Sequence, residues 1–312
     1  MLRDALLRLS TRPAIGRGLA RFPLTRSVVR RFVAGESAAD ALAALEALEG
    51  AGLLTAVTYL GENVTSREQA AAAADVYCEL VDEMRRRGLR TTPSLKLTHL
   101  GLDLGEDLAV EHVQRVLARA RDTLVWLDME ASPYVDRTLA MYRRLRRRWS
   151  NVACVLQAYL YRTEADLREL MAGGLRVRLC KGAYREPPQR AYPRKADVDR
   201  QYARLAGMLL SREAQAAGAY PAFATHDERL IRVIADQARD IGLPAERFEF
   251  QMLHGVRPDL HRALRGRGVR LRVLVPFGED WYGYFVRRLA ERPANLLFFL
   301  TQATRGRAAA DR

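Results

Sequence analysis

The sequence predicts an α/β protein built as a (β/α)8 barrel of the TIM type, with extra helices at its amino-terminal end. Eight short apolar runs alternate with helical patterns, which is typical of a closed parallel sheet. The chain has 312 residues, 49% of them hydrophobic, so it can fill the core of one large barrel or two ordinary domains. Because no linker rich in Pro, Ser or Gly divides it, we expect one catalytic domain. The runs are Leu53–Leu60, Ser94–Thr98, Thr123–Met129, Ala153–Tyr159, Leu175–Cys180, Ala222–Thr225, Phe248–Leu253 and Leu271–Val275.

Capping patterns and charge divide the chain into three expected parts: a helical arm over 1–50 that packs on the barrel, the catalytic barrel over 51–303, and a flexible tail over 304–312. Ser37 is a plausible N-cap with Asp40 three residues on, and Thr65-Ser-Arg-Glu68 reads as a capping box after the first strand. The first 31 residues contain eight Arg and one acid, Asp4, which resembles a transit peptide or a membrane-surface helix. We favour native helices, with peripheral membrane contact left open.

Composition argues against several other classes of protein. No run of 18 or more apolar residues exists, so no transmembrane helix is expected. Three widely spaced cysteines form neither a disulfide framework nor a zinc spacing, and the five histidines show no metal motif; both fit a cytoplasmic protein without a metal site. The net charge of +14 comes mostly from Arg in helical segments, without any nucleic-acid motif. We therefore expect solvated helix faces and no bound nucleic acid.

Polar residues at or near the carboxyl ends of six apolar runs give the strongest indication of a site. In a (β/α)8 barrel these ends meet on one face and build the active site. One such Lys could merely extend to solvent, but six strand ends with polar groups are harder to explain in that way. The residues are Lys96, Asp128, Gln157, Arg178, Thr225 with His226, and Gln251.

The segment after the fifth run has the features of a ligand-binding turn. Gly182 and Ala183 allow close backbone approach, and Arg178 and Lys181 offer positive charge to a phosphate or an anionic ring. No GxGxxG or Walker A motif is present, so a nucleotide cofactor would have to use barrel loops. A lone His is more often structural, but the position of His226 directly after a strand favours a functional role.

A second candidate feature is the helix predicted over Asp280–Asn295, which places Tyr284, Arg287, Arg288 and Glu291 in one sector. Trp281, Phe285 and Leu289 fall in the neighbouring sector and can face a core. Two Arg forks beside an aromatic ring suit a carboxylate, and Glu291 is placed to pair with either Arg. The alternative is a solvated basic face.

Four motifs, taken in order, resemble the proline dehydrogenase family. They are Arg178-Leu-Cys-Lys-Gly-Ala-Tyr184, Phe223-Ala-Thr-His226, Glu249-Phe-Gln-Met-Leu-His-Gly255 and Tyr284-Phe-Val-Arg-Arg-Leu-Ala-Glu-Arg-Pro-Ala-Asn295. The match covers about residues 32–302 and resembles the short monofunctional bacterial enzymes. It implies a distorted barrel with FAD at the strand ends. The implied reaction is oxidation of L-proline to Δ1-pyrroline-5-carboxylate, the first step of proline catabolism, by hydride transfer from C5 to flavin N5.

The resemblance also implies partners: a membrane quinone that accepts the electrons, and a pyrroline-5-carboxylate dehydrogenase that takes over the product. It implies roles for the candidate residues as well. Arg287 and Arg288 would hold the proline carboxylate, with Glu291 fixing the pair near the flavin and Tyr284 covering ring carbon C4. Lys96 and Asp128 would complete the substrate pocket, with Asp128 and Arg178 as catalytic residues. The flavin would be held by Met129, Gln157, Arg178, Lys181, Gly182, Ala183, Thr225, His226 and Gln251.

One departure from the family pattern is Leu274, because many relatives have a Tyr before the Val-Pro that follows. We expect retained proline oxidation with a looser pocket. Three alternatives stay open. The first is a hydroxyproline-preferring dehydrogenase. The second is a Schiff-base lyase or aldolase using Lys96 or Lys181. The third is a binding module for nucleic acid or anionic membrane, driven by the net charge.

Overall fold

A closed barrel of eight parallel strands forms the centre of the molecule. The computed structural model describes residues 29–171 and 173–291. Neighbouring strands pair in sequence order, and β8 pairs with β1 to close the ring. This confirms the predicted fold class. The strands are β1 (Leu54–Tyr59), β2 (Thr92–Leu95), β3 (Val125–Leu127), β4 (Val152–Gln157), β5 (Arg176–Cys180), β6 (Tyr220–Ala224), β7 (Glu249–Leu253) and β8 (Leu271–Phe277).

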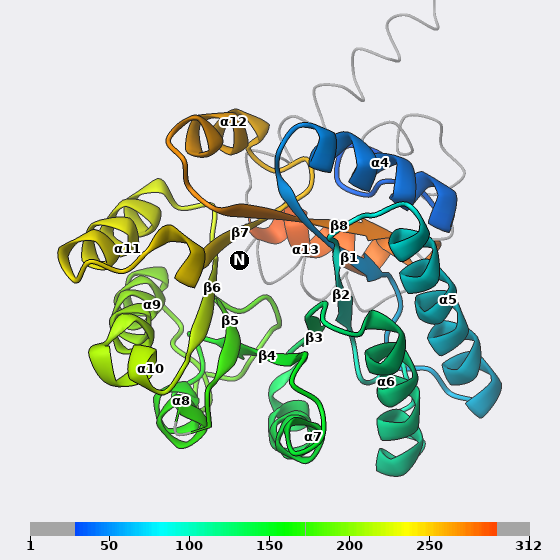
Figure 1. Cartoon of the computed structure of the whole chain (residues 1–312). Coiled ribbons are helices and arrows are strands. Elements are labelled where there is room, and N and C mark those ends of the chain that lie inside the picture. Colours follow the sequence, from blue (N-terminus) through cyan, green and yellow to red (C-terminus); the bar gives the residue numbers. More distant parts are fainter. Residues whose placement is uncertain (1–28, 172, 292–312) are drawn as a thin grey trace, which may run out of the picture.

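Helices connect successive strands and surround the barrel (Figure 1). The connecting helices are α5 (Arg67–Arg86), α6 (Glu106–Ala120), η1 (Ser132–Tyr134), α7 (Val135–Arg146), α8 (Thr163–Met171), α9 (Lys195–Leu210), α10 (Arg212–Ala216), α11 (Glu228–Asp240), η2 (Ala245–Arg247) and α12 (Pro258–Gly266). Helix α4 (Ala38–Gly50) precedes the barrel and α13 (Trp281–Glu291) follows β8. No helix in the described ranges is long and apolar enough to cross a membrane.

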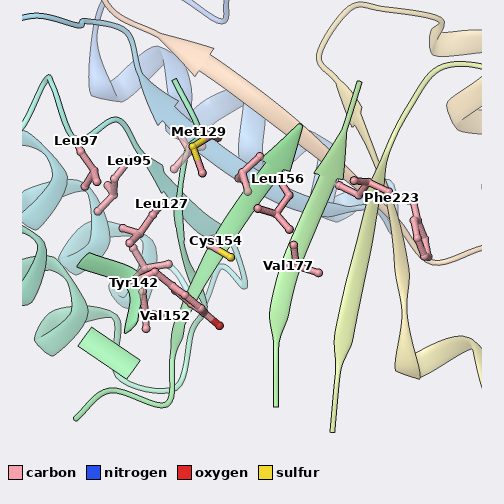
Figure 2. Packing of buried hydrophobic residues seen from close by; sticks show 14 of the residues in the cluster. Leu95, Leu97, Leu127, Met129, Tyr142, Val152, Cys154, Leu156, Val177 and Phe223 are labelled. Atoms are coloured by element: carbon pink, nitrogen blue, oxygen red, sulfur yellow. The ribbon is translucent and has the colours of Figure 1, made fainter. Parts of the chain in front are cut away.

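Most of the core lies between the strands and the outer helices. Tyr142 of α7 packs near Val152 and Cys154 of β4, as Figure 2 shows. A second, small cluster of Trp126, Ala153 and Ala222 is separate from this layer. The barrel interior is otherwise rich in polar side chains, and these reappear in the site described below.

Several predicted strands differ from the observed ones by one to three residues at an end, and two of these differences bear on the site. The second run continues to Thr98 and the third to Met129, but β2 ends at Leu95 and β3 at Leu127. The predicted ends of these two strands are too late in the sequence, because the residues that follow both strands are also mostly buried. As a result, Lys96 and Asp128 each occupy the first position after a strand.

The two predicted capping boxes have different outcomes. Ser37 and Asp40 cap α4 reciprocally, as expected. The second prediction is off by one residue: Ser66, not Thr65, is the N-cap of α5 and accepts from the Gln69 N–H. The Thr65 N–H donates to the Gln69 side chain at 2.9 Å. Both candidates are hydroxyl residues, and sequence alone did not decide between them.

The segment before α4 packs on the carboxyl end of β8. The Ala34 N–H donates to the Pro276 carbonyl, and the Gly278 N–H donates to the Gly35 carbonyl. Val29, Phe32 and Val33 share a buried cluster with Trp281, Phe285 and Leu289, which confirms the predicted apolar face of α13. The expected arm over 1–50 is described only from residue 29 onward, and the expected tail over 304–312 lies outside the described residues.

Candidate active site

A cavity of about 720 Å³ opens at the carboxyl ends of the strands and brings the candidate residues together. Such a volume is in the range of cofactor and small-molecule sites. A single amino acid the size of proline would leave much of it unfilled. Its lining includes Lys96, Asp128, Met129, Gln157, Arg178, Lys181, Gly182, Ala183, Thr225, His226, Gln251, Tyr284, Arg287 and Arg288. Glu291 ends α13, and its side chain lies outside the described residues.

Arg178 and Asp128 form a buried ion pair beside the cavity. Arg178 Nη1 lies 2.8 Å from Asp128 Oδ1, and Ser94 Oγ donates to the same oxygen at 2.7 Å. The guanidinium carbon lies 4.7 Å from the Trp126 ring centroid. Burial lowers the pKa of Arg178, with Asp128 opposing the shift. Within the described chain, Arg178 Nε and Nη2 are buried without a hydrogen-bond acceptor. Two donors are therefore available to a ligand.

The two glutamines of the site are oriented by acceptors of the protein. Gln157 Nε2 donates to the Glu130 carbonyl at 2.9 Å, and Gln251 Nε2 donates to Glu249 Oε1 at 2.6 Å. Both glutamines are almost fully buried, at 2% and 3% exposure. Each amide thus has a defined orientation at the cavity wall.

The turn after β5 approaches its neighbours closely. Gly182 has φ +112°, and a Cβ on this residue would lie only 2.3 Å from the Tyr159 ring. A side chain at this position is therefore disfavoured by both conformation and space. Lys181 Nζ pairs with Asp199, and with Asp227 at 3.3 Å. The turn places positive charge and open backbone at one side of the cavity.

The strand end at Thr225 contributes a hydroxyl and an imidazole. Thr225 Oγ1 accepts from the Asp227 N–H at 3.1 Å. His226 Nε2 accepts from the Leu253 N–H at 2.9 Å, so the proton of the neutral ring is on Nδ1. His254, which the sequence left unassigned, is not among the residues that line the cavity.

Helix α13 presents its basic and aromatic residues to the cavity, as the spacing predicted. The Arg288 guanidinium lies 5.0 Å from the Tyr284 ring centroid. Arg287 contacts Glu62 through two nitrogens, at 3.1 and 3.4 Å, and its guanidinium lies 5.4 Å from the Tyr184 ring. The alternative of a solvated basic face is wrong for Arg287, which is 8% exposed.

Lys96, which is 8% exposed, interacts electrostatically with Glu130, Glu62 and His99. Burial raises the pKa of Glu130, while the Thr98 hydroxyl and Lys96 act in the opposite direction. For Glu62, burial is outweighed by Arg287 and Lys96, and the pKa is below its ordinary value. Burial and the charge of Lys96 lower the pKa of His99 to about 4. Lys96 and Arg287 line the cavity, whereas Glu130 and Glu62, which interact with them, are not among the lining residues.

Sequence reasoning missed Glu62 and Tyr184. Glu62 lies in the turn after β1, so the strand-end argument that found the other polar residues could have found it. Tyr184 belongs to the quoted motif after β5 and lines the cavity.

Fold and site together show a (β/α)8 barrel with a large cavity at the strand ends, lined by basic, polar and aromatic side chains. The family model described as proline dehydrogenase matches residues 41–300. The chain is 38% identical to proline dehydrogenase 1 of Bacillus subtilis over 302 residues, 96% of this chain and 98% of the relative. It is 38% identical to proline dehydrogenase of Deinococcus radiodurans over 313 residues, 98% of this chain and 99% of the relative.

A solved structure, proline utilization A of Bdellovibrio bacteriovorus inactivated by N-propargylglycine, superposes with a TM-score of 0.78 at 26% identity. The match covers 85% of this chain and 32% of that longer chain. This chain therefore spans about a third of that relative. The chain belongs to the proline dehydrogenase family, and it is an oxidoreductase of proline catabolism.

Proposed function

We propose that this chain oxidises L-proline to Δ1-pyrroline-5-carboxylate with FAD held in the cavity at the strand ends. The observation that carries the proposal is the pair of buried, unsatisfied donors on Arg178 at the wall of a cavity larger than proline requires. Unsatisfied buried N–H groups are costly, so an acceptor-rich ligand is expected at this place. The polar edge of a flavin ring supplies such acceptors.

The residues around Arg178 suit the rest of the cofactor. Lys181 and the backbone at Gly182 and Ala183 offer positive charge and open N–H groups to phosphates. Thr225 and His226 add a hydroxyl and an imidazole, and Met129 lies beside Asp128. When bound, FAD would supply the hydride acceptor, atom N5, for the hydrogen at proline C5. The roles of Gln157, Gln251 and Glu291 toward the flavin are part of the same proposal.

The substrate would bind between α13 and the wall that carries Lys96. Arg287 and Arg288 would hold the carboxylate by their planar forks, and this remote contact would fix the ring over the reacting atom. Tyr284 would cover C4, where hydroxyproline carries its hydroxyl. Lys96 and Asp128 would complete the pocket, with Asp128 held in place by Arg178 and Ser94. Closing these side chains over proline would exclude water.

Electron transfer beyond the flavin is proposed from family membership alone. We expect a membrane quinone to accept the electrons, with the protein in the cytoplasm and in peripheral contact with the inner face of the membrane. Relatives called bifunctional PutA match this chain over 24% of their length. Handover of the product to a pyrroline-5-carboxylate dehydrogenase is consistent with that relation.

An anaerobic absorbance spectrum tests cofactor, substrate and reaction together. We expect flavin bands in the purified protein and their bleaching when L-proline is added. D-proline and glycine serve as controls and should leave the bands unchanged. A colourless protein that binds no added FAD, or a bound flavin that L-proline does not reduce, would contradict the proposal. Borohydride trapping of a substrate adduct on Lys96 or Lys181 would instead support a Schiff-base enzyme.

A further inference from the structure

A second buried ion pair lies beside Gln251. Arg272 Nε and Nη2 lie 2.7 and 2.9 Å from the two oxygens of Glu249, and both residues are at most 5% exposed. Tyr220 Oη donates to Glu249 Oε2 at 2.8 Å, and Arg272 Nη1 donates to the Thr55 carbonyl at 2.7 Å. Neither partner lines the cavity. A buried pair is weak evidence for stability, so its contact with Gln251 is of interest.

Glu249 determines which end of the Gln251 amide faces the cavity. Paired with Arg272, Glu249 is a carboxylate and can only accept, so the amide group against Oε1 must be the NH2 group. The carbonyl oxygen of Gln251 is then the end left for the cavity, which Gln251 lines from β7. The distance of 2.6 Å between Gln251 Nε2 and Glu249 Oε1 is that of a short, charge-assisted hydrogen bond.

The space between Arg178 and Gln251 suits a flat ring. Strand β6 lies between β5 and β7, and Ala222 and Ala224 are its alternate residues. Ala222 packs with Trp126, and Ala224 lines the cavity. These side chains leave room over β6. An oxidised isoalloxazine has acceptors at N5, C4=O and C2=O and a single ring N–H, at N3. Donors at Arg178 and an acceptor at Gln251 match that polarity.

We propose that Glu249 and Arg272 are positioning residues that hold the Gln251 carbonyl oxygen toward the cavity, where it accepts a hydrogen bond from the flavin N3–H. The inference rests on the proposed FAD site and adds an atom-level role to it. Gln251 contacts the cofactor, whereas Glu249 and Arg272 act through Gln251.

Binding of FAD and of N3-methyl-FAD to the deflavinated full chain tests this, with flavin fluorescence as the readout. N3-methylation removes the N3–H donor and also adds a methyl group, so the Glu249→Gln variant, which leaves Gln251 itself unchanged, is needed to separate a lost hydrogen bond from a steric effect. Since one hydrogen bond contributes about 1 kcal/mol, we expect the wild type to prefer FAD about fivefold to tenfold. Gln251→Leu should reduce this preference to about one. Glu249→Gln should reduce it too, because an amide at 249 no longer fixes the Gln251 orientation.

A matched variant separates positioning from general damage. Tyr220→Phe removes another hydrogen bond to Glu249 and should keep the preference. If Glu249→Gln fails to fold, Glu249→Leu/Arg272→Met replaces the pair by apolar side chains and should also lose the preference.

Each outcome decides between the two proposals. A wild type that binds both flavins equally, or a Gln251→Leu variant that still prefers FAD, would overturn the N3–H contact. If the Glu249 variants prefer FAD over N3-methyl-FAD as strongly as the wild type does, the positioning role is overturned. A wild type that binds neither flavin would contradict the proposed function itself.

Discussion

Arg287 contacts Glu62 with two guanidinium nitrogens, the same fork that a proline carboxylate would need. Sequence reasoning found the Arg pair because helical spacing is a local property. It did not find this partner, since Glu62 lies 225 residues away in the chain. The position of Glu62 after β1 could have marked it as a candidate, but its pairing with Arg287 depends on barrel closure between β1 and β8 and has no local signature.

The first prediction at the residue scale concerns Arg288. Arg288→Ala should raise the KM for proline at least about 100-fold, because each charge-assisted hydrogen bond contributes about 1.5–3 kcal/mol. The KM of Arg288→Lys should lie between those of the wild type and Arg288→Ala, since an ammonium group keeps the charge but cannot form the two parallel hydrogen bonds of a guanidinium. Steady-state kinetics would measure both. Arg148→Ala, in the exposed turn after α7, serves as control. An unchanged KM in Arg288→Ala would refute the carboxylate clamp.

The contact between Arg287 and Glu62 leads to a second prediction, in which a substitution strengthens proline binding. Because Glu62 competes with the substrate carboxylate for Arg287, Glu62→Gln should tighten proline binding about threefold to tenfold. In the wild type the pKa of Glu62 is below its ordinary value, so this carboxylate stays ionised at neutral pH. Anaerobic titration with a carboxylate analogue of proline that carries no reactive hydrogen would measure the dissociation constant. Weaker binding in this variant would show that Glu62 supports the clamp instead.

Leu274 is the residue at which this chain departs from the resemblance, and its side chain lines the cavity. A leucine offers no hydroxyl to the substrate, so we expect proline oxidation to persist with weaker discrimination against 4-hydroxyproline. Leu274→Tyr should increase the ratio of kcat/KM for proline over hydroxyproline. Leu253→Ile, another change at the cavity wall, should not. A strong preference of the wild type for hydroxyproline would contradict the expected substrate.

At the scale of elements, the corrected cap of α5 makes a direct prediction. Ser66 Oγ accepts the Gln69 N–H, so Ser66→Ala should lower the free energy of unfolding by about 1 kcal/mol. Thr65→Ala should have a smaller effect, because Thr65 contributes its backbone N–H to the main contact. Urea denaturation of the two variants measures the difference. If both variants lose the same free energy of unfolding, or if Thr65→Ala loses more, Thr65 would be favoured as the N-cap, as the sequence predicted.

Elements were predictable to the extent that local pattern determines them. The eight strands alternate with helices in the predicted order, since buried parallel strands give short apolar runs. Their ends were less predictable: the turn after β2 is as buried as the strand, and the apolar run continues through it to Thr98. The strand-end argument succeeded for Lys96, Gln157 and Arg178 because one face of the barrel collects every carboxyl end. It could not predict which carboxylate orients Gln251.

For the whole molecule, the polar barrel interior is both the site and a source of instability without its ligand. Hydrophobic burial lies mainly outside the barrel wall, between strands and helices. Inside, Arg178 has two buried nitrogens that no described residue accepts from. If the cavity holds the proposed FAD, the cofactor should stabilise the protein, because a ligand that binds only the folded state shifts the unfolding equilibrium.

FAD should therefore raise the melting temperature in a concentration-dependent way. At a free FAD concentration of 100 times the dissociation constant, the gain is about 2.7 kcal/mol, which corresponds to roughly 4 °C for a chain of 312 residues. Arg178→Leu should abolish most of the gain, because it removes the two buried nitrogens that are proposed to donate to the flavin ring. Calorimetric scans of the deflavinated protein at several FAD concentrations measure the shift, with riboflavin as a control that lacks the phosphates proposed to bind near Lys181. A melting temperature independent of FAD would mean that the cavity does not hold the cofactor, whereas equal gains in wild type and Arg178→Leu would place the flavin away from Arg178.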